Sequence, residues 1–134
     1  MATLKISDLS VGDWVRCGDE NKQIKCIDLQ NNNYFVHFSD PDTNDYDYAH
    51  ILDIEPIPIT AEILEKNGFR KNGEYNEWNI GKWDERPFIG VSIDRQSMRV
   101  KYFGNDIFIE NKVVCVHQLQ HALRLAGVEK EINL

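Results

Sequence analysis

Apolar and polar residues alternate along the first third of the chain in the way that β-strands require. The candidate strands are residues 14–17, 23–29 and 34–39. In the third, alternation places Val36 on one face of a sheet and Phe35 and His37 on the other. Three asparagines precede it, and asparagine tolerates the left-handed backbone angles of a tight turn. The pattern predicts an antiparallel meander.

Two prolines separate this meander from a predicted helix. Pro56 and Pro58 fix their own φ angles and push the preceding residues out of the helical region. Thr60 is a suitable N-cap because its hydroxyl can accept a hydrogen bond from the first helical turn. Gly68 suits the left-handed position that ends a helix. We therefore expect an extended connector at 53–59, followed by a short helix.

The second half repeats this arrangement. Alternation predicts strands at 75–80, 88–93 and 98–103 and a helix at 114–126 that ends at Gly127. In the last strand, Met98, Val100 and Tyr102 share one face, which leaves Arg99, Lys101 and Phe103 on the other.

The predicted fold class is α+β, with two antiparallel β-meanders that are each followed by a short helix. We expect residues 1–55 to form a meander or a small β-barrel lobe. Residues 56–134 would hold a helix, a three-stranded meander and the C-terminal helix. A chain of 134 residues fits one compact unit made of both parts.

The opening of the chain resembles small Tudor-type or KOW-type β-barrels over about its first 55 residues. The residues that carry the resemblance are G-D-W-V at 12–15, the asparagine turn and Y-F-V-H-F-S-D at 34–40. It implies a recognition module for peptides or nucleic acid, although the acidic first half does not support the nucleic-acid version.

Three further segments carry a second resemblance, which spans the whole chain in order. They are L-S-V-G-D-W-V at 9–15, I-E-P-I-P-I-T-A-E-I-L-E-K-N-G-F at 54–69 and V-H-Q-L-Q-H-A-L-R-L-A-G-V-E at 116–129. The chain is similar to small proteins of unassigned function that are encoded in gut Bacteroidetes genomes, their prophages and mobile elements. The resemblance implies a phage or mobile-element setting and supplies no activity.

The charge is negative and unevenly distributed. The net charge is −7, with 5 Lys/Arg against 13 Asp/Glu in residues 1–67 and 10 against 9 in residues 68–134. Affinity for a nucleic-acid backbone depends on matching phosphates with Lys and Arg, so general backbone binding is not expected. A small anionic ligand should bind to the second half.

Cysteine usage and hydropathy bear on the compartment. The chain has three cysteines, Cys17, Cys26 and Cys115, which is an odd number. They stand among apolar or strand-forming neighbours, and we interpret them as reduced, buried packing residues. The start of the chain does not have the pattern of a signal peptide, and no run approaches the roughly 20 apolar residues that cross a bilayer. We expect a protein that stays in the cytoplasm of a bacterial host, with no membrane partner.

Motifs for catalysis or metal binding are incomplete. His117 and His121 have the spacing of two zinc ligands on a helix, but Gln118 stands where a metalloprotease has its glutamate. We interpret the pair as polar surface of a solvent-facing helix. The acidic loop at 40–48 lacks the glycine and the final acidic residue of an EF-hand. No serine lies in a nucleophile elbow. We predict no enzyme activity, cofactor or metal site.

Two clusters are candidate binding sites. Guanidinium and ammonium groups hold phosphates, and aromatic faces stack on bases. The candidate ligand-binding residues of this kind are Arg86, Arg95, Arg99, Lys101, Trp78, Trp83 and Tyr102. The candidate partner-binding residues, in the acidic tyrosine-bearing loop, are Asp42, Asp45, Tyr46 and Tyr48. The alternative is that the aromatic side chains fill the core while the charged ones remain solvated.

The sequence thus favours a non-catalytic binding protein of phage or mobile-element type. Its leading function is interference with a host process, either by masking a host protein or by sequestering a small nucleotide signal. A structural virion or assembly component is the alternative from a different functional class.

Overall fold

The structure is a computed structural model that describes residues 4–40, 46–72, 77–81, 88–94, 97–110 and 114–134. The described residues form three antiparallel sheets and two α-helices, which confirms the α+β fold class. The chain divides into two units, Met1–Ile57 and Pro58–Leu134.

The first unit contains two three-stranded sheets. Its strands are β1 (Trp14–Cys17), β2 (Glu20–Gln23), β3 (Cys26–Gln30), β4 (Asn33–His37), β5 (Tyr48–His50) and β6 (Ile54–Glu55). They are arranged as β2-β1-β6 and β3-β4-β5, and the described strands do not close into the barrel considered above. The sequence predicted no strand between the candidate strands at 14–17 and 23–29, but Glu20–Gln23 forms β2 and pairs with the whole of β1.

Apolar side chains from both sheets form the core of this unit. Val15, Ile24 and Val36 are fully buried, and short 3₁₀ turns at Ile6–Asp8 and Ile51–Asp53 add further apolar contacts. The predicted asparagine turn is confirmed, since Asn31 and Asn32 have φ angles of 51° and 65°.

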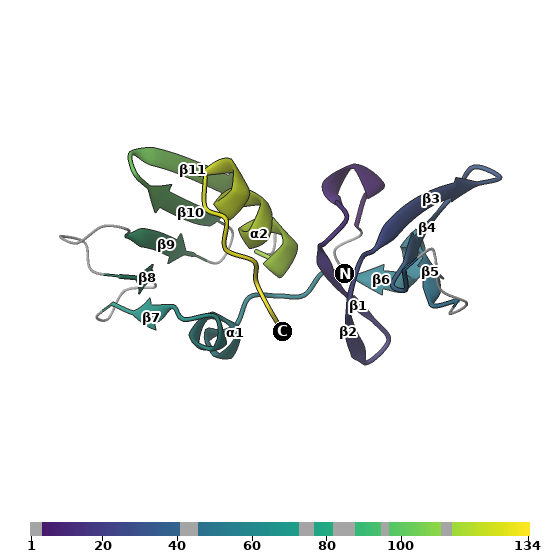
Figure 1. The fold of residues 1–134 in the computed structure, drawn as a ribbon, viewed down its shortest axis with the longest axis horizontal. Helices are drawn as coiled ribbons and strands as arrows, with labels where there is room; N and C mark the ends of the chain where they lie inside the picture. The colour runs from purple at the N-terminus through teal and green to yellow at the C-terminus, as the bar shows by residue number, and fades with distance from the viewer. Residues whose placement is uncertain (1–3, 41–45, 73–76, 82–87, 95–96, 111–113) are drawn as a thin grey trace. The chain divides into compact units, whose positions relative to one another are not determined.

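The second unit is built on a five-stranded sheet. Its elements are α1 (Ala61–Lys66), β7 (Arg70–Lys71), β8 (Glu77–Ile80), β9 (Ile89–Ile93), β10 (Ser97–Tyr102), β11 (Asn105–Glu110) and α2 (Val116–Leu125). The strand order is β11-β10-β9-β8-β7, and all neighbours are antiparallel (Figure 1). The predicted three-stranded meander corresponds to β8, β9 and β10, and the edge strands β7 and β11 were not predicted.

One face of this sheet is buried. Met98 and Val100 of β10 and Val91 of β9 are at most 1% exposed. Helix α2 packs against β10 and β11 and buries Leu119 and Leu123 (Figure 1). This arrangement confirms the predicted division of β10 into an apolar face and a charged face.

The helix ends follow the sequence signals. The Thr60 hydroxyl accepts a hydrogen bond from the Ile63 amide at 3.2 Å, as an N-cap should. Gly68 ends α1 with a φ of 88°, and Gly127 follows α2 with a φ of 92°. Neither α-helix of the described ranges is long and apolar enough to span a bilayer.

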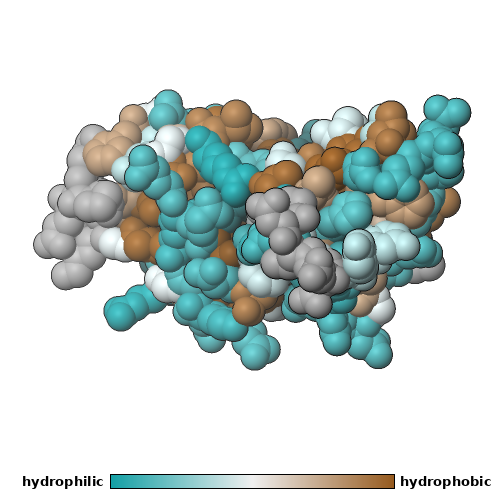
Figure 2. Space-filling model, turned by 45° about the vertical axis from the view of Figure 1, so that its right-hand side comes forward, coloured by the Kyte–Doolittle hydropathy of each residue, from teal (hydrophilic) through white to brown (hydrophobic). Residues whose placement is uncertain are grey.

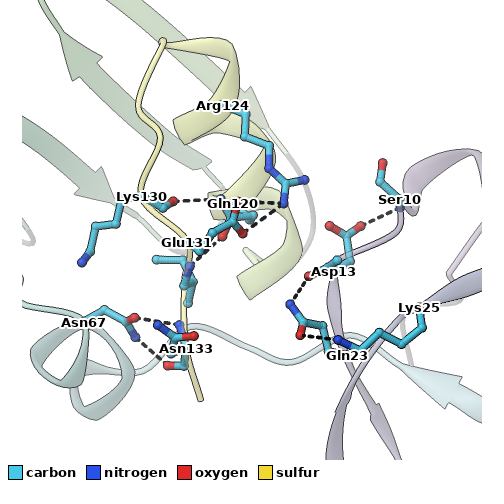
Figure 3. A network of polar contacts seen from close by, with 12 residues as sticks. Ser10, Asp13, Gln23, Lys25, Asn67, Gln120, Arg124, Lys130, Glu131 and Asn133 are labelled. Atoms are coloured by element: carbon cyan, nitrogen blue, oxygen red, sulfur yellow. Dashed lines mark hydrogen bonds and ion pairs between the residues drawn. The ribbon is translucent and has the colours of Figure 1, made fainter. Parts of the chain in front are cut away.

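Two side-chain amides fasten the segment after α2 (Figure 3). The Asn67 amide donates to the Asn133 carbonyl and accepts from the Asn133 N–H, both at 2.8 Å. The Gln120 amide donates to the Lys130 carbonyl at 3.0 Å and accepts from the Ile132 N–H at 2.7 Å. Ile132 between these contacts is 1% exposed. The sequence indicated none of this.

Candidate functional site

The exposed face of the five-stranded sheet is defined by the register of its strands. Lys101 of β10 stands between Gly90 of β9 and Asp106 of β11. Arg99, two residues earlier, stands between Ser92 and Phe108. Directly paired residues share a face, so Arg99, Lys101, Asp106 and Phe108 lie side by side on this surface. The row through Lys101 and Gly90 continues to Arg70 of β7, which is a third cation on the face.

Phe88 covers the position where Gly90 has no side chain. A Cβ atom added at Gly90 would lie 3.3 Å from Phe88 Cε1 and 3.6 Å from Asn79 Oδ1. The absence of a side chain therefore leaves room for the phenyl ring next to Lys101. A glycine in a strand often marks such a close approach.

Two hollows lie on this face, and both are lined by Lys101. The first, of about 400 Å³, lies toward the β10–β11 turn. It is lined by Phe88, Lys101, Tyr102, Phe103, Gly104, Asn105 and Asp106. The second, of about 510 Å³, lies toward the other end of β10. It is lined by Glu77, Ser92, Ile93, Asp94, Ser97, Arg99, Lys101 and Phe108.

The two cations have different electrostatic surroundings. Arg99 Nε lies 3.3 Å from Asp106 Oδ1, and its guanidinium carbon lies 5.3 Å from the centre of the Phe108 ring. Within the described ranges, no acidic side chain forms an ion pair with Lys101. Of the two cations that line the hollows, Lys101 is therefore the one that can meet a ligand anion without first leaving a carboxylate.

The structure brings together only some of the predicted ligand-binding residues. Arg99 and Lys101 lie on the exposed face as expected. Trp78 does not, because it belongs to the buried face and is 6% exposed. By alternation Tyr102 also belongs to the buried face, although it borders the first hollow. Arg86, Trp83 and Arg95 fall outside the described residues.

Among the described residues, three phenylalanines supply aromatic surface beside the hollows. Phe103 and Phe108 are 50% and 54% exposed, and Phe88 is half-buried. The sequence placed Phe103 on the charged face of a predicted strand at 98–103, but in the structure Phe103 follows β10 in the turn, with a φ of 49°. Phe108 could not be placed without strand β11, and Phe88 could not be placed without the space above Gly90.

A second surface lies on the sheet β3-β4-β5 of the first unit. The Phe35 ring meets Tyr48 at 5.9 Å and His50 at 5.3 Å, both edge to face, and the His37 ring lies 5.4 Å from Tyr48. His37 Nε2 lies 3.7 Å from Asp28 Oδ2. We call these five residues the aromatic–histidine face.

The predicted partner-binding residues are only partly described. Asp42 and Asp45 fall outside the described residues. Tyr46 is 85% exposed, while Tyr48 belongs to β5 rather than to a loop and joins the aromatic–histidine face. Tyr48 therefore has a fixed strand position and fixed neighbours.

The histidine pair of α2 is not the polar surface that the sequence suggested. His117 is 2% exposed, and its ring lies 5.9 Å from that of His121. In the part of the chain that the structure describes, no three His, Cys, Asp or Glu side chains gather as a metal site would require.

Cys26 pairs with His37 and lies on the same side of its sheet as the aromatic–histidine face, whereas Cys115 does not line either hollow. All three cysteines are free, but Cys17 and Cys26 are half-buried rather than buried as expected. Cys115, at the N-cap of α2, is buried, and this burial raises the pKa of its thiol to about 11. A thiol that holds its proton in this way is a poor nucleophile at neutral pH.

Hydrophobicity alone does not locate a site. On the view in Figure 2, hydrophobic residues occur in small groups between hydrophilic ones. Scattered apolar side chains of this kind are normal on a protein surface. The exposed sheet face is distinguished instead by its combination of hollows, cations and rings.

Comparison with known proteins adds no family to this description. No family model, curated protein or solved structure matches the chain.

Proposed function

We propose that this chain is a non-catalytic binding protein that holds a small nucleotide-type anion on the exposed face of its five-stranded sheet. The observation that carries the proposal is the position of Lys101. Its ammonium is free of ion pairs among the described residues, lines both hollows and has aromatic rings in each of them. A phosphate beside a flat, partly apolar base fits this combination.

The chemistry of the face accommodates both parts of such a ligand. Lys101 supplies a charge-assisted hydrogen bond to a phosphate oxygen. Phe103 and Phe108 offer exposed rings, and base stacking on an aromatic ring contributes about 1–3 kcal/mol. The nearby Glu77 carboxylate, which lines the second hollow, can accept hydrogen bonds from the amino group of a base.

The distribution of charge between the units supports this location. Residues 1–57 hold 4 Lys/Arg against 11 Asp/Glu, whereas residues 58–134 hold 11 of each. A phosphate near the first unit would meet a net charge of −7, which repels it. The second unit has no net charge, so it does not repel a phosphate in this way.

The biological setting of the proposal comes from the resemblance to prophage and mobile-element proteins. In that setting a binder without catalysis acts by sequestering a nucleotide signal and so interferes with a host process. A structural virion or assembly component remains the alternative, and its sign would be high copy number in purified particles.

The proposal is tested by adding mononucleotides and cyclic nucleotides to the isotope-labelled protein and following its amide resonances. Binding at the proposed site should shift the amides of β9, β10 and the β10–β11 turn in a saturable way. The amides of β3, β4 and β5 serve as the internal control and should not move. Shifts confined to the first unit, or no shift with any nucleotide, would contradict the proposal.

A second candidate function has its own observation in the first unit. The aromatic–histidine face combines the exposed ring of Tyr48 and three half-buried rings with Asp28, on the unit that holds the whole net charge of −7. Lysine and arginine side chains are attracted both to ring faces and to acidic surroundings. We therefore propose a basic segment of a host protein as the partner that this face would mask.

This second candidate is tested with a short arginine-rich peptide and a glutamate-rich peptide of equal length. The arginine-rich peptide should bind, and Tyr48→Ala should weaken its binding several-fold. Leu52→Ala is the matched control, because Leu52 is also highly exposed and lies outside the face. Equal binding of both peptides, or equal loss in both variants, would rule this candidate out.

A further inference from the structure

We infer that the exposed sheet face binds two bases joined through one phosphate, so that the ligand is a dinucleotide unit rather than a mononucleotide. This inference rests on the proposed function and makes it more specific. It starts from the fact that Lys101 is shared by two hollows instead of lying at the end of one.

Aromatic rings lie in the hollows on both sides of Lys101. Toward the β10–β11 turn, the first hollow contains the rings of Phe88 and Phe103. Toward the start of β10, the second hollow contains the ring of Phe108 with Arg99 against it. Each side of the lysine therefore offers its own stacking surface.

The spacing between Lys101 and its neighbours on the face fits the length of a nucleotide. Arg99 is two residues before Lys101 in β10, and two residues of a strand span roughly 7 Å. Phe103 follows β10 in the turn to β11 and lines the first hollow together with Lys101. Phe108 stands opposite Arg99 and is therefore a diagonal neighbour of Lys101, at roughly 7–8 Å. A sugar can bridge a gap of this size between a phosphate on Lys101 and a base on Phe108.

The volumes of the two hollows also fit a ligand with two bases. Hollows of about 400 Å³ and 510 Å³ each fall in the range of small-molecule sites, roughly 300–1,000 Å³. A mononucleotide with its phosphate on Lys101 would place its base in one hollow and leave the other to water. A ligand with one base in each hollow covers both aromatic surfaces and still needs a single cation.

A dinucleotide unit can come from a free dinucleotide or from a single strand, and the phosphodiester between two bases is common to both. Calorimetry with mono-, di- and tetranucleotides of one base composition separates these sources. An affinity that stops rising at two nucleotides indicates a free dinucleotide. An affinity that rises further at four indicates a segment of a strand. Both results support the two-base site.

The expected gain from the second base is large enough to measure. One additional stacked base should tighten binding by about 5- to 150-fold, so the dinucleotide should exceed the best mononucleotide by that factor. Phe108→Leu removes one stacking ring and retains apolar bulk, and it should bring the dinucleotide close to mononucleotide affinity. Tyr34→Leu is the control, since Tyr34 is also an exposed aromatic residue but belongs to the first unit.

Failure of the inference differs from failure of the proposed function. If mononucleotides bind at this face and dinucleotides bind no more tightly, the two-base site is wrong and the proposed function stands. If Phe108→Leu and Tyr34→Leu leave the dinucleotide affinity equally unchanged, the two-base site is also wrong. If no nucleotide of any length binds, both are wrong.

Discussion

Replacement of Asn67 by alanine should destabilise the second unit considerably, although Asn67 lies far from the proposed site in sequence. Its side chain makes three hydrogen bonds, each 2.8 Å long. One is to the Ile63 carbonyl and the other two are to the backbone of Asn133. At about 0.5–1.5 kcal/mol each, their loss gives about 1.5–4.5 kcal/mol in the free energy of unfolding. Because Asn67 is 6% exposed, little water can replace its bonds.

The control for this prediction is Asn133→Ala. Asn67 binds the backbone of Asn133, so removal of the exposed Asn133 side chain should change the free energy of unfolding by less than about 0.5 kcal/mol. Urea unfolding followed by circular dichroism measures both variants. Amide hydrogen exchange gives a local measure, since the Asn133 N–H should lose protection in Asn67→Ala. Equal stability of Asn67→Ala and the natural protein, or an equal cost in both variants, would refute the reasoning.

The remaining predictions concern a helix cap, a thiol and metal content. Thr60→Ala should cost about 0.5–2 kcal/mol of unfolding free energy in a urea melt and Thr60→Ser much less, because the serine hydroxyl can still accept the Ile63 amide hydrogen bond. Since burial raises the pKa of Cys115 from 9.0 to about 11, the stability that comes from its neutral thiol should be present below pH 9 and decline as the pH rises toward 11. Alkylation of the folded protein at pH 8 followed by mass spectrometry should therefore modify Cys17 and Cys26 well before Cys115, and equal rates at all three would contradict the burial. Addition of EDTA should leave the melting temperature unchanged, and a fall that zinc restores would show that the histidine pair of α2 belongs to a metal site.

The parts of the fold with regular alternation could be predicted from the sequence. Strand β10 alternates apolar and charged residues from Met98 to Tyr102, and the structure places the two sets on opposite faces as expected. Thr60 and Gly68 marked the ends of α1 because each performs a local task that few residues perform as well. Such signals depend on near neighbours and are therefore visible in the sequence.

The edge strands could not be predicted in the same way. Strand β11 opens with Asn105 and Asp106, and of its apolar residues Ile107 and Ile109 are half-buried while Phe108 is exposed. Strand β2 is polar throughout and is held by pairing with β1 rather than by burial of its own side chains. Both depend on a partner strand, and a polar segment that lacks an apolar face resembles a loop when it is examined alone.

The residues of the candidate site could also be predicted from the sequence only in part. Sequence reasoning found the two exposed cations, Arg99 and Lys101, and chose Trp78 as a stacking surface because tryptophan is a good stacking residue. The indole of Trp78 instead fills the core. The rings beside Lys101 come from Phe88 and Phe108, which the pairing of three strands brings to it.

The central claim is that the Lys101 ammonium binds the phosphate of a nucleotide, and a comparison of two lysine variants tests it most directly. Lys71 is the matched control, because it is also exposed, lies in the same sheet and does not line either hollow. In calorimetry with the best-binding nucleotide, Lys101→Ala should weaken affinity by about 10- to 100-fold, since a hydrogen bond to a charged group contributes about 1.5–3 kcal/mol. Lys71→Ala should retain the affinity of the natural protein. Equal affinities for Lys101→Ala and Lys71→Ala would contradict the account.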